Sequence, residues 1–176
     1  MFYLKDHGFV IRRINFGDSD RYITLFTRDH GKIEVVAKGV RKITSKRSGN
    51  VELLNLISFQ TVRSSKNLIL TEVQLVNSFD ELKRELQYIG KVFLMCEIID
   101  AALAPGVPHA DVFNLMGRAL AHVKKDAETL TYFQAKLLSM LGFWDQNKSF
   151  KNAAHVRAVT EEVIERKLRT HAVFGI

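Results

Sequence analysis

The sequence predicts an α+β protein, in which a small β-barrel is followed by a helical C-terminal domain. Apolar and polar residues alternate with a period of two up to about residue 77, as they do in strands with one buried face. From Ser78 onward apolar residues recur at spacings of three and four, the period of an amphipathic helix. No repeat, low-complexity tract or flexible linker divides the chain, so we expect two directly packed domains, 1–78 and 79–176.

Five short segments of the N-terminal half are typical of strands. The predicted strands are 9–14, 22–27, 33–37, 51–60 and 68–76. The second and third are joined by Arg28-Asp29-His30-Gly31, a hairpin turn in which glycine can adopt positive φ without steric cost. Five short strands in about seventy-five residues favour a closed barrel, because closure removes exposed sheet edges. The OB-fold is the leading candidate for this barrel.

The C-terminal half begins with one long predicted helix. A capping box, Ser78-x-x-Glu81, marks its start, and Pro105-Gly106 marks its end. A second helix is expected to open within residues 108–111.

Two further helices are predicted near the C-terminus. One covers 131–141, with a cap at its start and Gly142 suited to a left-handed C-terminal cap. The other begins near Thr160, because acidic residues would then lie in its first turn and basic residues in its last. Residues 145–158 are polar and unpatterned, and we expect a loop there.

The positive charge is unevenly divided. The chain has a net charge of +7, and residues 1–75 contain thirteen Lys and Arg against seven Asp and Glu. Residues 76–176 contain thirteen against twelve. Five cations and no carboxylate fall within residues 38–47. Such asymmetry indicates a polyanionic partner for the N-terminal half.

No catalytic motif is present in the sequence. It contains no phosphate-binding glycine loop and no nucleophile elbow, and six scattered histidines with one cysteine cannot build a structural zinc site. Asp18-x-Asp20 could hold a nuclease metal, but without a further acidic cluster we expect these carboxylates to cap a loop or pair with Arg21. We therefore expect no enzyme activity, no cofactor and no metal.

Sequence features also favour a cytoplasmic protein. The longest apolar stretch, residues 92–104, is interrupted by Glu97 and Asp100 and is too short to span a bilayer. The N-terminus has no basic region followed by an apolar one, so no signal peptide is expected. The single cysteine, Cys96, lies in an apolar helical pattern and is expected to be buried.

The predicted nucleic-acid interface lies in the N-terminal half. Single-strand binding needs cations for the phosphates and flat rings for the bases, and Phe16, Tyr22 and Phe26 lie close to arginines, although strand aromatics are more often core residues. The 38–47 loop cannot bury its charges, and replacing Arg41, Lys42, Lys46 and Arg47 is expected to cost little stability because they do not lie in a periodic strand. The predicted DNA-binding residues are Arg12, Arg13, Arg21, Lys38, Arg41, Lys42, Lys46 and Arg47.

Several motifs follow one another in a recognisable order. They are Gly17-x-x-Asp20-Arg21, then Leu25-Phe26-Thr27-Arg28-x-His30-Gly31-Lys32, then Ala37-Lys38-Gly39 followed by Arg41, Lys42, Ser45 and Lys46, and finally Leu138-x-x-Leu141-Gly142-Phe143. The first three closely resemble the opening of the bacterial recombination mediator family RecO. The last looks like the "LLGF" signature of the helical domain of that family.

The resemblance implies an N-terminal OB-fold, a helical C-terminal domain and a role in RecF-type recombination. Members of the family bind single- and double-stranded DNA and anneal complementary strands. They partner with RecR and contact the C-terminal tail of the single-stranded DNA-binding protein, which helps RecA load. We expect the chain to be monomeric by itself.

The chain departs from the family pattern in two ways. It is short for the family, and many members carry a cysteine-rich zinc module after "LLGF". Here residues 143–147 continue without a cysteine, so we expect that module to be absent. Two other functions stay open: an OB-fold RNA-binding module, and a metal-dependent nuclease that uses Asp18 and Asp20.

Overall fold

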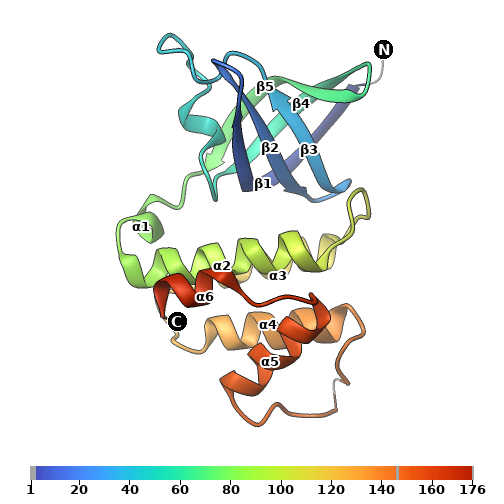
Figure 1. The fold of residues 1–176 in the computed structure, drawn as a ribbon, viewed down its shortest axis with the longest axis vertical. Helices are drawn as coiled ribbons and strands as arrows, with labels where there is room; N and C mark the ends of the chain where they lie inside the picture. The colour runs from blue at the N-terminus through green and yellow to red at the C-terminus, as the bar shows by residue number, and fades with distance from the viewer. Residues whose placement is uncertain (1–2, 146, 176) are drawn as a thin grey trace. The chain divides into compact units, whose positions relative to one another are not determined.

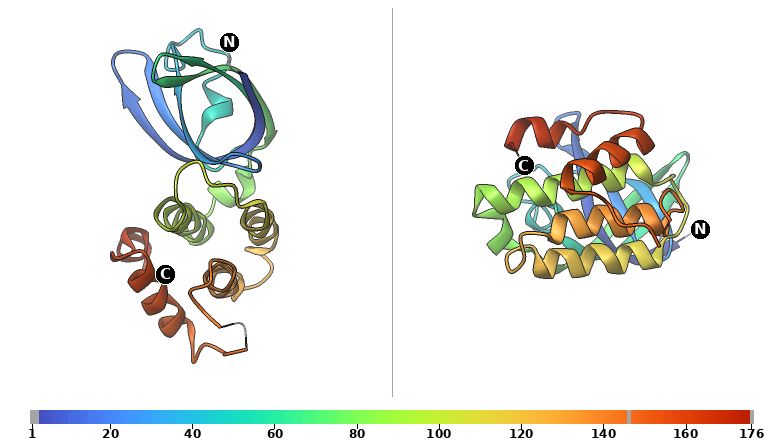
Figure 2. Two further views of the ribbon diagram at one scale, coloured as in Figure 1. Left: turned by 90° about the vertical axis from the view of Figure 1, so that its right-hand side faces the viewer. Right: turned by 90° about the horizontal axis from the view of Figure 1, so that it is seen from below.

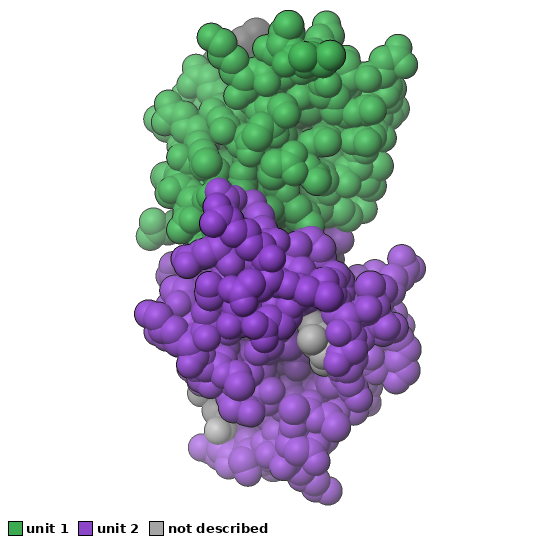
Figure 3. Space-filling model, turned by 90° about the vertical axis from the view of Figure 1, so that its left-hand side faces the viewer, with its two compact units in different colours: residues 1–79, 103–110 green, residues 80–102, 111–176 purple. Residues whose placement is uncertain are grey.

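A computed structural model of the chain describes residues 3–145 and 147–175. Met1 and Phe2 of the N-terminal sequence, Gln146 in the expected loop, and Ile176 lie outside the described residues. The chain divides into two compact units (Figure 3). Unit 1 comprises residues 1–79 and 103–110, and unit 2 comprises residues 80–102 and 111–176. The predicted domains, 1–78 and 79–176, stay a prediction.

Unit 1 is a closed barrel with the strand order β1-β2-β3-β5-β4 (Figure 1). Neighbouring strands are antiparallel except β3 and β5, and β4 closes the barrel by pairing with β1. In the left view of Figure 2 the strands curl into a ring. This arrangement confirms the predicted α+β class with an OB-type barrel. The strands are β1 (Tyr3–Phe16), β2 (Asp20–Thr27), β3 (Gly31–Ala37), β4 (Leu56–Ser64) and β5 (Asn67–Asn77).

The first strand is long enough to pair with two neighbours. Residues 3–9 pair with β4 and residues 8–16 pair with β2, with a register shift between Val10 and Arg12. A bulge of this kind bends a strand and increases its twist, which lets β1 belong to both sides of the barrel. The buried core comprises Leu4, Val10, Ile23, Leu25, Val35, Ala37, Val40, Val51, Ile57, Phe59 and Leu70.

The connection between β3 and β4 packs into the barrel core. It contains the short 3-10 helix η1 (Gly49–Val51), and Val40, Val51 and Leu54 are buried. The sequence prediction of a strand from residue 51 is wrong at its start, because β4 begins only at Leu56. The alternation seen around residue 51 comes from apolar side chains of an irregular segment that enters the core.

Residues 103–110 pack against the β2–β3 hairpin within unit 1. The N–H of Gly106 donates a hydrogen bond of 2.9 Å to the carbonyl of Lys32. Gly31 has a φ of +67°, and a Cβ at this position would lie 2.1 Å from the carbonyl oxygen of Val107. The predicted hairpin turn is confirmed, and glycine is needed both for the backbone conformation and for the close approach.

Unit 2 consists of helices, and α2 contacts α1, α4 and α6 and contributes a largely buried segment between Gly90 and Ile99. The left view of Figure 2 shows α2, α3 and α4 nearly end-on. The ring of Phe174 in α6 packs edge-on against Phe93 of α2, and Gly90 leaves room for it. The helices are α1 (Asp80–Lys83), α2 (Leu86–Ala102), α3 (Ala110–His122), α4 (Thr129–Met140), α5 (Ala153–Val163) and α6 (Arg169–Phe174). None of the helices in the described residues is long and apolar enough to cross a membrane.

The predicted long first helix is in fact two helices. The backbone of Phe79 is left-handed (φ 51°), and its N–H donates to the side chain of Asn77, so the expected capping box does not start the helix. A break then follows α1. Leu82 is buried whereas Leu86 is 74 % exposed, although in one continuous helix the two would lie on the same face.

The prediction for the last two helices is also wrong in part. α5 begins at Ala153 inside the expected loop, because the side chain of Asn152 accepts a 2.9 Å hydrogen bond from the N–H of His155 and caps the helix. Glu161 lies near the end of this helix rather than in a first turn. Its carboxylate accepts hydrogen bonds from Lys167 and from the N–H of Leu168, and thereby holds the connection to α6. The predicted left-handed Gly142 after α4 is confirmed, with φ 81°.

Candidate nucleic-acid interface

The most basic segment of the barrel is the loop of residues 38–47, which we call the basic loop. Four of its five cationic side chains are exposed. Among the described residues no carboxylate forms an ion pair with any of these four. They are Lys38, Arg41, Lys42 and Lys46. Unpaired cations on the surface are available to an anionic ligand such as the phosphates of a nucleic acid.

The basic loop is fixed on one side to the β1–β2 turn. The carboxylate of Asp20 accepts a 2.7 Å hydrogen bond from the N–H of Gly39. The backbone N–H of Arg41 donates to the carbonyl of Ser19 at 2.9 Å, and its guanidinium donates to the carbonyl of Gly17 at 3.1 Å. Asp20 therefore has the loop-capping role that was predicted as the alternative to metal binding.

Arg47 fixes the other side of the basic loop. Its guanidinium donates to the carbonyl of Lys38 at 3.0 Å, and to those of Leu70 and Thr71 at 3.2 and 3.5 Å. These contacts indicate that replacing Arg47 would cost more stability than replacing Arg41, Lys42 or Lys46. A guanidinium has five N–H donors in a fixed plane, which suits it to bridging several carbonyls. Its position as a phosphate ligand stays a prediction.

The three strand arginines of the predicted interface are paired with acids. Arg13 and Arg21 both contact the carboxylate of Glu52, with Arg21 at 3.2 Å. Arg12 pairs with Glu34 at 3.2 Å. These pairs offset much of the charge that the sequence places on the strands. Glu52 and Glu34 have a role that sequence reasoning missed, because nothing in their local pattern indicates which arginine lies opposite.

The three aromatic residues near these arginines have different exposures. Phe26 is fully buried, so it cannot stack on a base. Phe16 is 53 % exposed, and its ring packs edge-on against Tyr22 with 4.9 Å between ring centroids. Only Phe16 and Tyr22 therefore retain the predicted possibility of base contact.

Metal and thiol chemistry find no support within the described residues. No group of three or more His, Cys, Asp or Glu in those residues is arranged to hold a metal ion. Cys96 is buried as predicted, and burial, together with the nearby Asp100 carboxylate, raises the pKa of its thiol to about 12. A thiol of this kind is protonated and unreactive at neutral pH.

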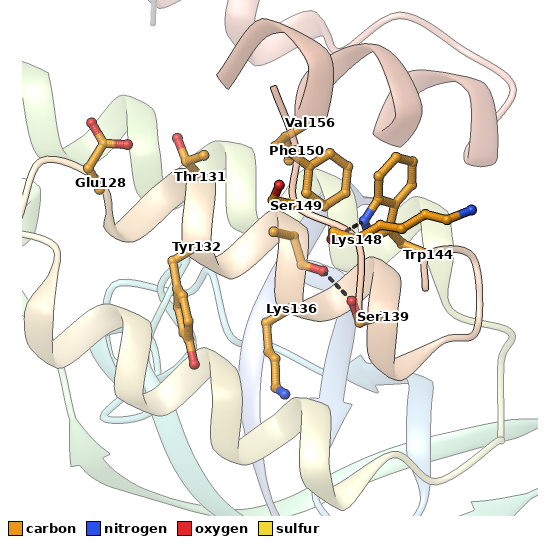
Figure 4. Close-up of a pocket in the computed structure, with 11 residues that line it drawn as sticks. Glu128, Thr131, Tyr132, Lys136, Ser139, Trp144, Lys148, Ser149, Phe150 and Val156 are labelled. Atoms are coloured by element: carbon orange, nitrogen blue, oxygen red, sulfur yellow. Dashed lines mark hydrogen bonds between the residues drawn. The ribbon is translucent and has the colours of Figure 1, made fainter. Parts of the chain in front are cut away.

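Unit 2 has an open pocket of about 470 Å³ between α4 and the segment that leads into α5 (Figure 4). Trp144 and Phe150 form a stacked pair in its wall, with ring centroids 4.1 Å apart, and Trp144 donates to the carbonyl of Lys148 at 2.9 Å. Tyr132, which is 60 % exposed, and Lys136 line the α4 side. The pocket thus combines exposed aromatic surface with two lysines at its rim, and sequence reasoning missed it because its residues were expected to be partly a loop.

Comparison with known proteins shows to which family this chain belongs. The family model described as "Recombination protein O N terminal" matches residues 1–79, and "Recombination protein O C terminal" matches residues 84–144. The chain belongs to the RecO family.

Curated RecO relatives have moderate sequence identity to this chain. The DNA repair protein RecO of Desulfitobacterium hafniense (strain DSM 10664 / DCB-2) is 33 % identical over 136 residues, which is 76 % of this chain and 50 % of the relative. The DNA repair protein RecO of Symbiobacterium thermophilum is 33 % identical over 140 residues, covering 77 % and 55 %. That of Bacillus pumilus is 28 % identical over 143 residues, covering 79 % and 56 %. The chain therefore spans about half the length of the curated relatives that it matches.

Proposed function

We propose that this RecO-family chain is a non-catalytic recombination mediator in DNA repair. It binds single- and double-stranded DNA and anneals complementary strands. With RecR it helps load RecA onto DNA covered by the single-stranded DNA-binding protein. The observation that carries the proposal is the basic loop, whose exposed cations have no carboxylate partner among the described residues.

The mechanism needs no bond to be made or broken by the protein. Two DNA strands repel each other through their phosphates, and a surface that neutralises phosphates releases condensed counterions and lets the strands approach. Because phosphate contacts carry no base information, the annealing surface is expected to act on any sequence. No phosphate-cradling glycine loop is present in the chain, so ATP is expected to be dispensable.

Strand annealing with two complementary oligonucleotides, one carrying a donor and the other an acceptor dye, tests this proposal. The protein is expected to accelerate the rise of energy transfer without ATP or magnesium. It is expected to do so also when the strands are coated with the cognate single-stranded DNA-binding protein. A chain that binds neither DNA strand would contradict the proposal, and tighter binding to RNA of the same sequence would favour an RNA-binding module instead.

The pocket of unit 2 supports the proposed contact with the tail of the single-stranded DNA-binding protein. An acidic tail that ends in a hydrophobic residue needs an apolar pocket with cations at the rim, and Lys136 and Lys148 lie beside Tyr132, Trp144 and Phe150. Calorimetry with a peptide that copies this tail is expected to detect binding to the full chain. Tyr132→Ala, at an exposed position, is expected to weaken it, whereas Lys38→Ala in the barrel provides a control that leaves it unchanged.

The assignment to RecR and RecA is tested separately. Addition of RecR together with this chain is expected to shorten the lag before RecA hydrolyses ATP on coated single-stranded DNA, and either protein alone is expected to do less. An unchanged lag with both proteins would limit the function to DNA binding and annealing.

A further inference from the structure

An apolar patch lies on β1 beside the β1–β2 turn. Ile14 and Phe16 are two positions apart, so they project from the same face of the strand, and they are 50 % and 53 % exposed. On the neighbouring strand Tyr22 is paired with Ile14 in the antiparallel register. Exposed apolar side chains in such a cluster are costly in water unless they contact a ligand or partner.

The ring of Phe16 packs against Tyr22 on one side. Its edge-on contact with Tyr22 has 4.9 Å between ring centroids and an interplanar angle of 63°. Pairs of this geometry are favourable beyond the area that they bury. A ring that is fixed on one side and half-exposed on the other presents a flat surface with little conformational freedom left to lose.

The same turn that carries Phe16 also holds the basic loop. Arg41 donates to the carbonyl of Gly17, the residue directly after Phe16, and to that of Ser19. Asp20 holds Gly39 from the same turn. The turn that directly follows the exposed ring is therefore joined to the basic loop by hydrogen bonds.

We propose that Phe16 is a stacking platform for an unpaired base of single-stranded DNA, with Tyr22 and Ile14 supporting the ring and the basic loop binding the adjoining phosphates. This inference rests on the proposed function and adds a residue that distinguishes single strands from duplexes. Every base has a flat face, so stacking of this kind tolerates any sequence. In a duplex the faces of the bases are already stacked on each other, and only the phosphates remain for the loop.

Removing the ring should therefore weaken binding to single strands selectively. Loss of one base–ring contact is expected to lower affinity for single-stranded DNA about five- to tenfold, and to leave affinity for a duplex of equal length unchanged. The salt dependence of binding should keep its slope, because no phosphate contact is lost. Annealing should slow for the same reason, since a base held on the ring is unpaired and accessible.

The experiment compares Phe16→Leu, Phe16→Tyr and Phe16→Trp by fluorescence anisotropy on single-stranded and duplex oligonucleotides. Leucine keeps an apolar side chain but removes the ring, whereas tyrosine and tryptophan keep a flat surface. We expect the affinity for single strands to rank tryptophan and the parent above leucine, with duplex affinity constant. Tyr3→Leu is the matched control, because Tyr3 is an aromatic residue at the other end of β1 and is 64 % exposed.

The possible outcomes separate the inference from the function beneath it. If the parent protein binds no DNA, the proposed function is contradicted. If the parent binds DNA and all three Phe16 variants bind single strands as tightly as the parent does, only the inference of a stacking platform is overturned. An equal loss on single strands and duplexes also overturns it, because the ring would then act through the loop. Thermal melts identify any variant that is unfolded, and the tyrosine and tryptophan variants keep the ranking measurable in that case.

Discussion

The basic loop can be tested by removing charge without disturbing its anchors. Arg41 and Arg47 hold the loop through backbone carbonyls, so they are left in place. The suitable change is the triple variant Lys38→Ala, Lys42→Ala and Lys46→Ala, at three exposed lysines. Substitutions at such positions usually change the free energy of unfolding by less than about 0.5 kcal/mol.

The expected effect on DNA binding follows from counterion release. Each phosphate contact contributes about 0.7 to the slope of log K against log salt on single-stranded DNA, so three contacts contribute about 2. Across an about fourfold rise in salt, the parent is then expected to lose about 20-fold more affinity than the triple variant does. The loss should be similar for every sequence, because phosphate contacts do not distinguish bases.

The assay is fluorescence anisotropy of a labelled single strand over a salt series, with thermal melts as the test of folding. A second triple variant, Lys125→Ala, Lys148→Ala and Lys151→Ala, removes the same charge from exposed lysines of unit 2. Only the loop variant is expected to flatten the slope. A loop variant that melts like the parent and keeps its slope would refute the reasoning. Equal flattening in both variants would mean that net charge alone governs binding.

Further predictions concern stability and reactivity. The buried hydroxyl of Thr61 has no hydrogen-bond partner within residues 3–145 and 147–175, so Thr61→Val should raise the urea-unfolding free energy by about 1 kcal/mol, and a decrease would contradict this. Gly31→Ala should cost at least about 2 kcal/mol, because its Cβ would meet a carbonyl oxygen at 2.1 Å, whereas Gly17→Ala, with positive φ in open space, should cost only about 1. Burial opposes ionisation of Glu97, but its hydrogen bonds from two N–H groups at the start of α6 lower its pKa overall. At pH values above the ordinary glutamate pKa of about 4.3, Glu97→Gln should therefore lower the free energy of unfolding by about 1 kcal/mol. This difference should vanish as the pH falls through the lowered pKa of Glu97. A constant difference down to a pH of about 2 would exclude this linkage. Cys96 should react with a thiol reagent only after unfolding, and rapid labelling of the native protein would show that it is accessible.

The barrel could be predicted from sequence because its signals are local. Alternation with period two, β-branched runs and the glycine of the β2–β3 hairpin each need only a few neighbouring residues. The start of β4 could not be predicted in this way. Val51 and Leu53 have the period-two spacing of a strand, but the buried residues are Val51 and Leu54, because an irregular segment rather than a strand enters the barrel core here.

The sequence-based prediction of helix boundaries is wrong where a tertiary contact determines where the helix begins or ends. Leu82 and Leu86 have helical spacing, yet the helix is interrupted between them and only Leu82 is buried. The charge pattern places Glu161 in the first turn of a helix, whereas its partner, Lys167, lies six residues later in the connection to α6. The charge order that suits a helix dipole also suits an ion pair outside the helix, so the pattern has two physical explanations.

The candidate interface shows the same limit for charge. Sequence identifies the cations but not their partners. The lysines of the basic loop, which pair with no carboxylate in the part of the chain that the structure describes, therefore look equivalent to the paired Arg13 and Arg21. Arg47 differs from the lysines of the loop because its guanidinium reaches carbonyls of β5 and of Lys38. Long-range pairing of this kind depends on sheet register, which no local motif around residue 47 contains.

The anchoring of the basic loop has a kinetic consequence. The hydrogen bond that Asp20 accepts and those that Arg41 and Arg47 donate hold the loop in shape before any ligand arrives, so its ordering entropy is lost on folding and not on association. Encounter with DNA should then be a single bimolecular step, fast at low salt through electrostatic attraction and without a lag for loop rearrangement. In a rapid-mixing experiment the observed rate would rise linearly with DNA concentration and show no plateau. Arg47→Ala removes the hydrogen bonds that hold one side of the loop, and is expected to introduce a plateau in the observed rate.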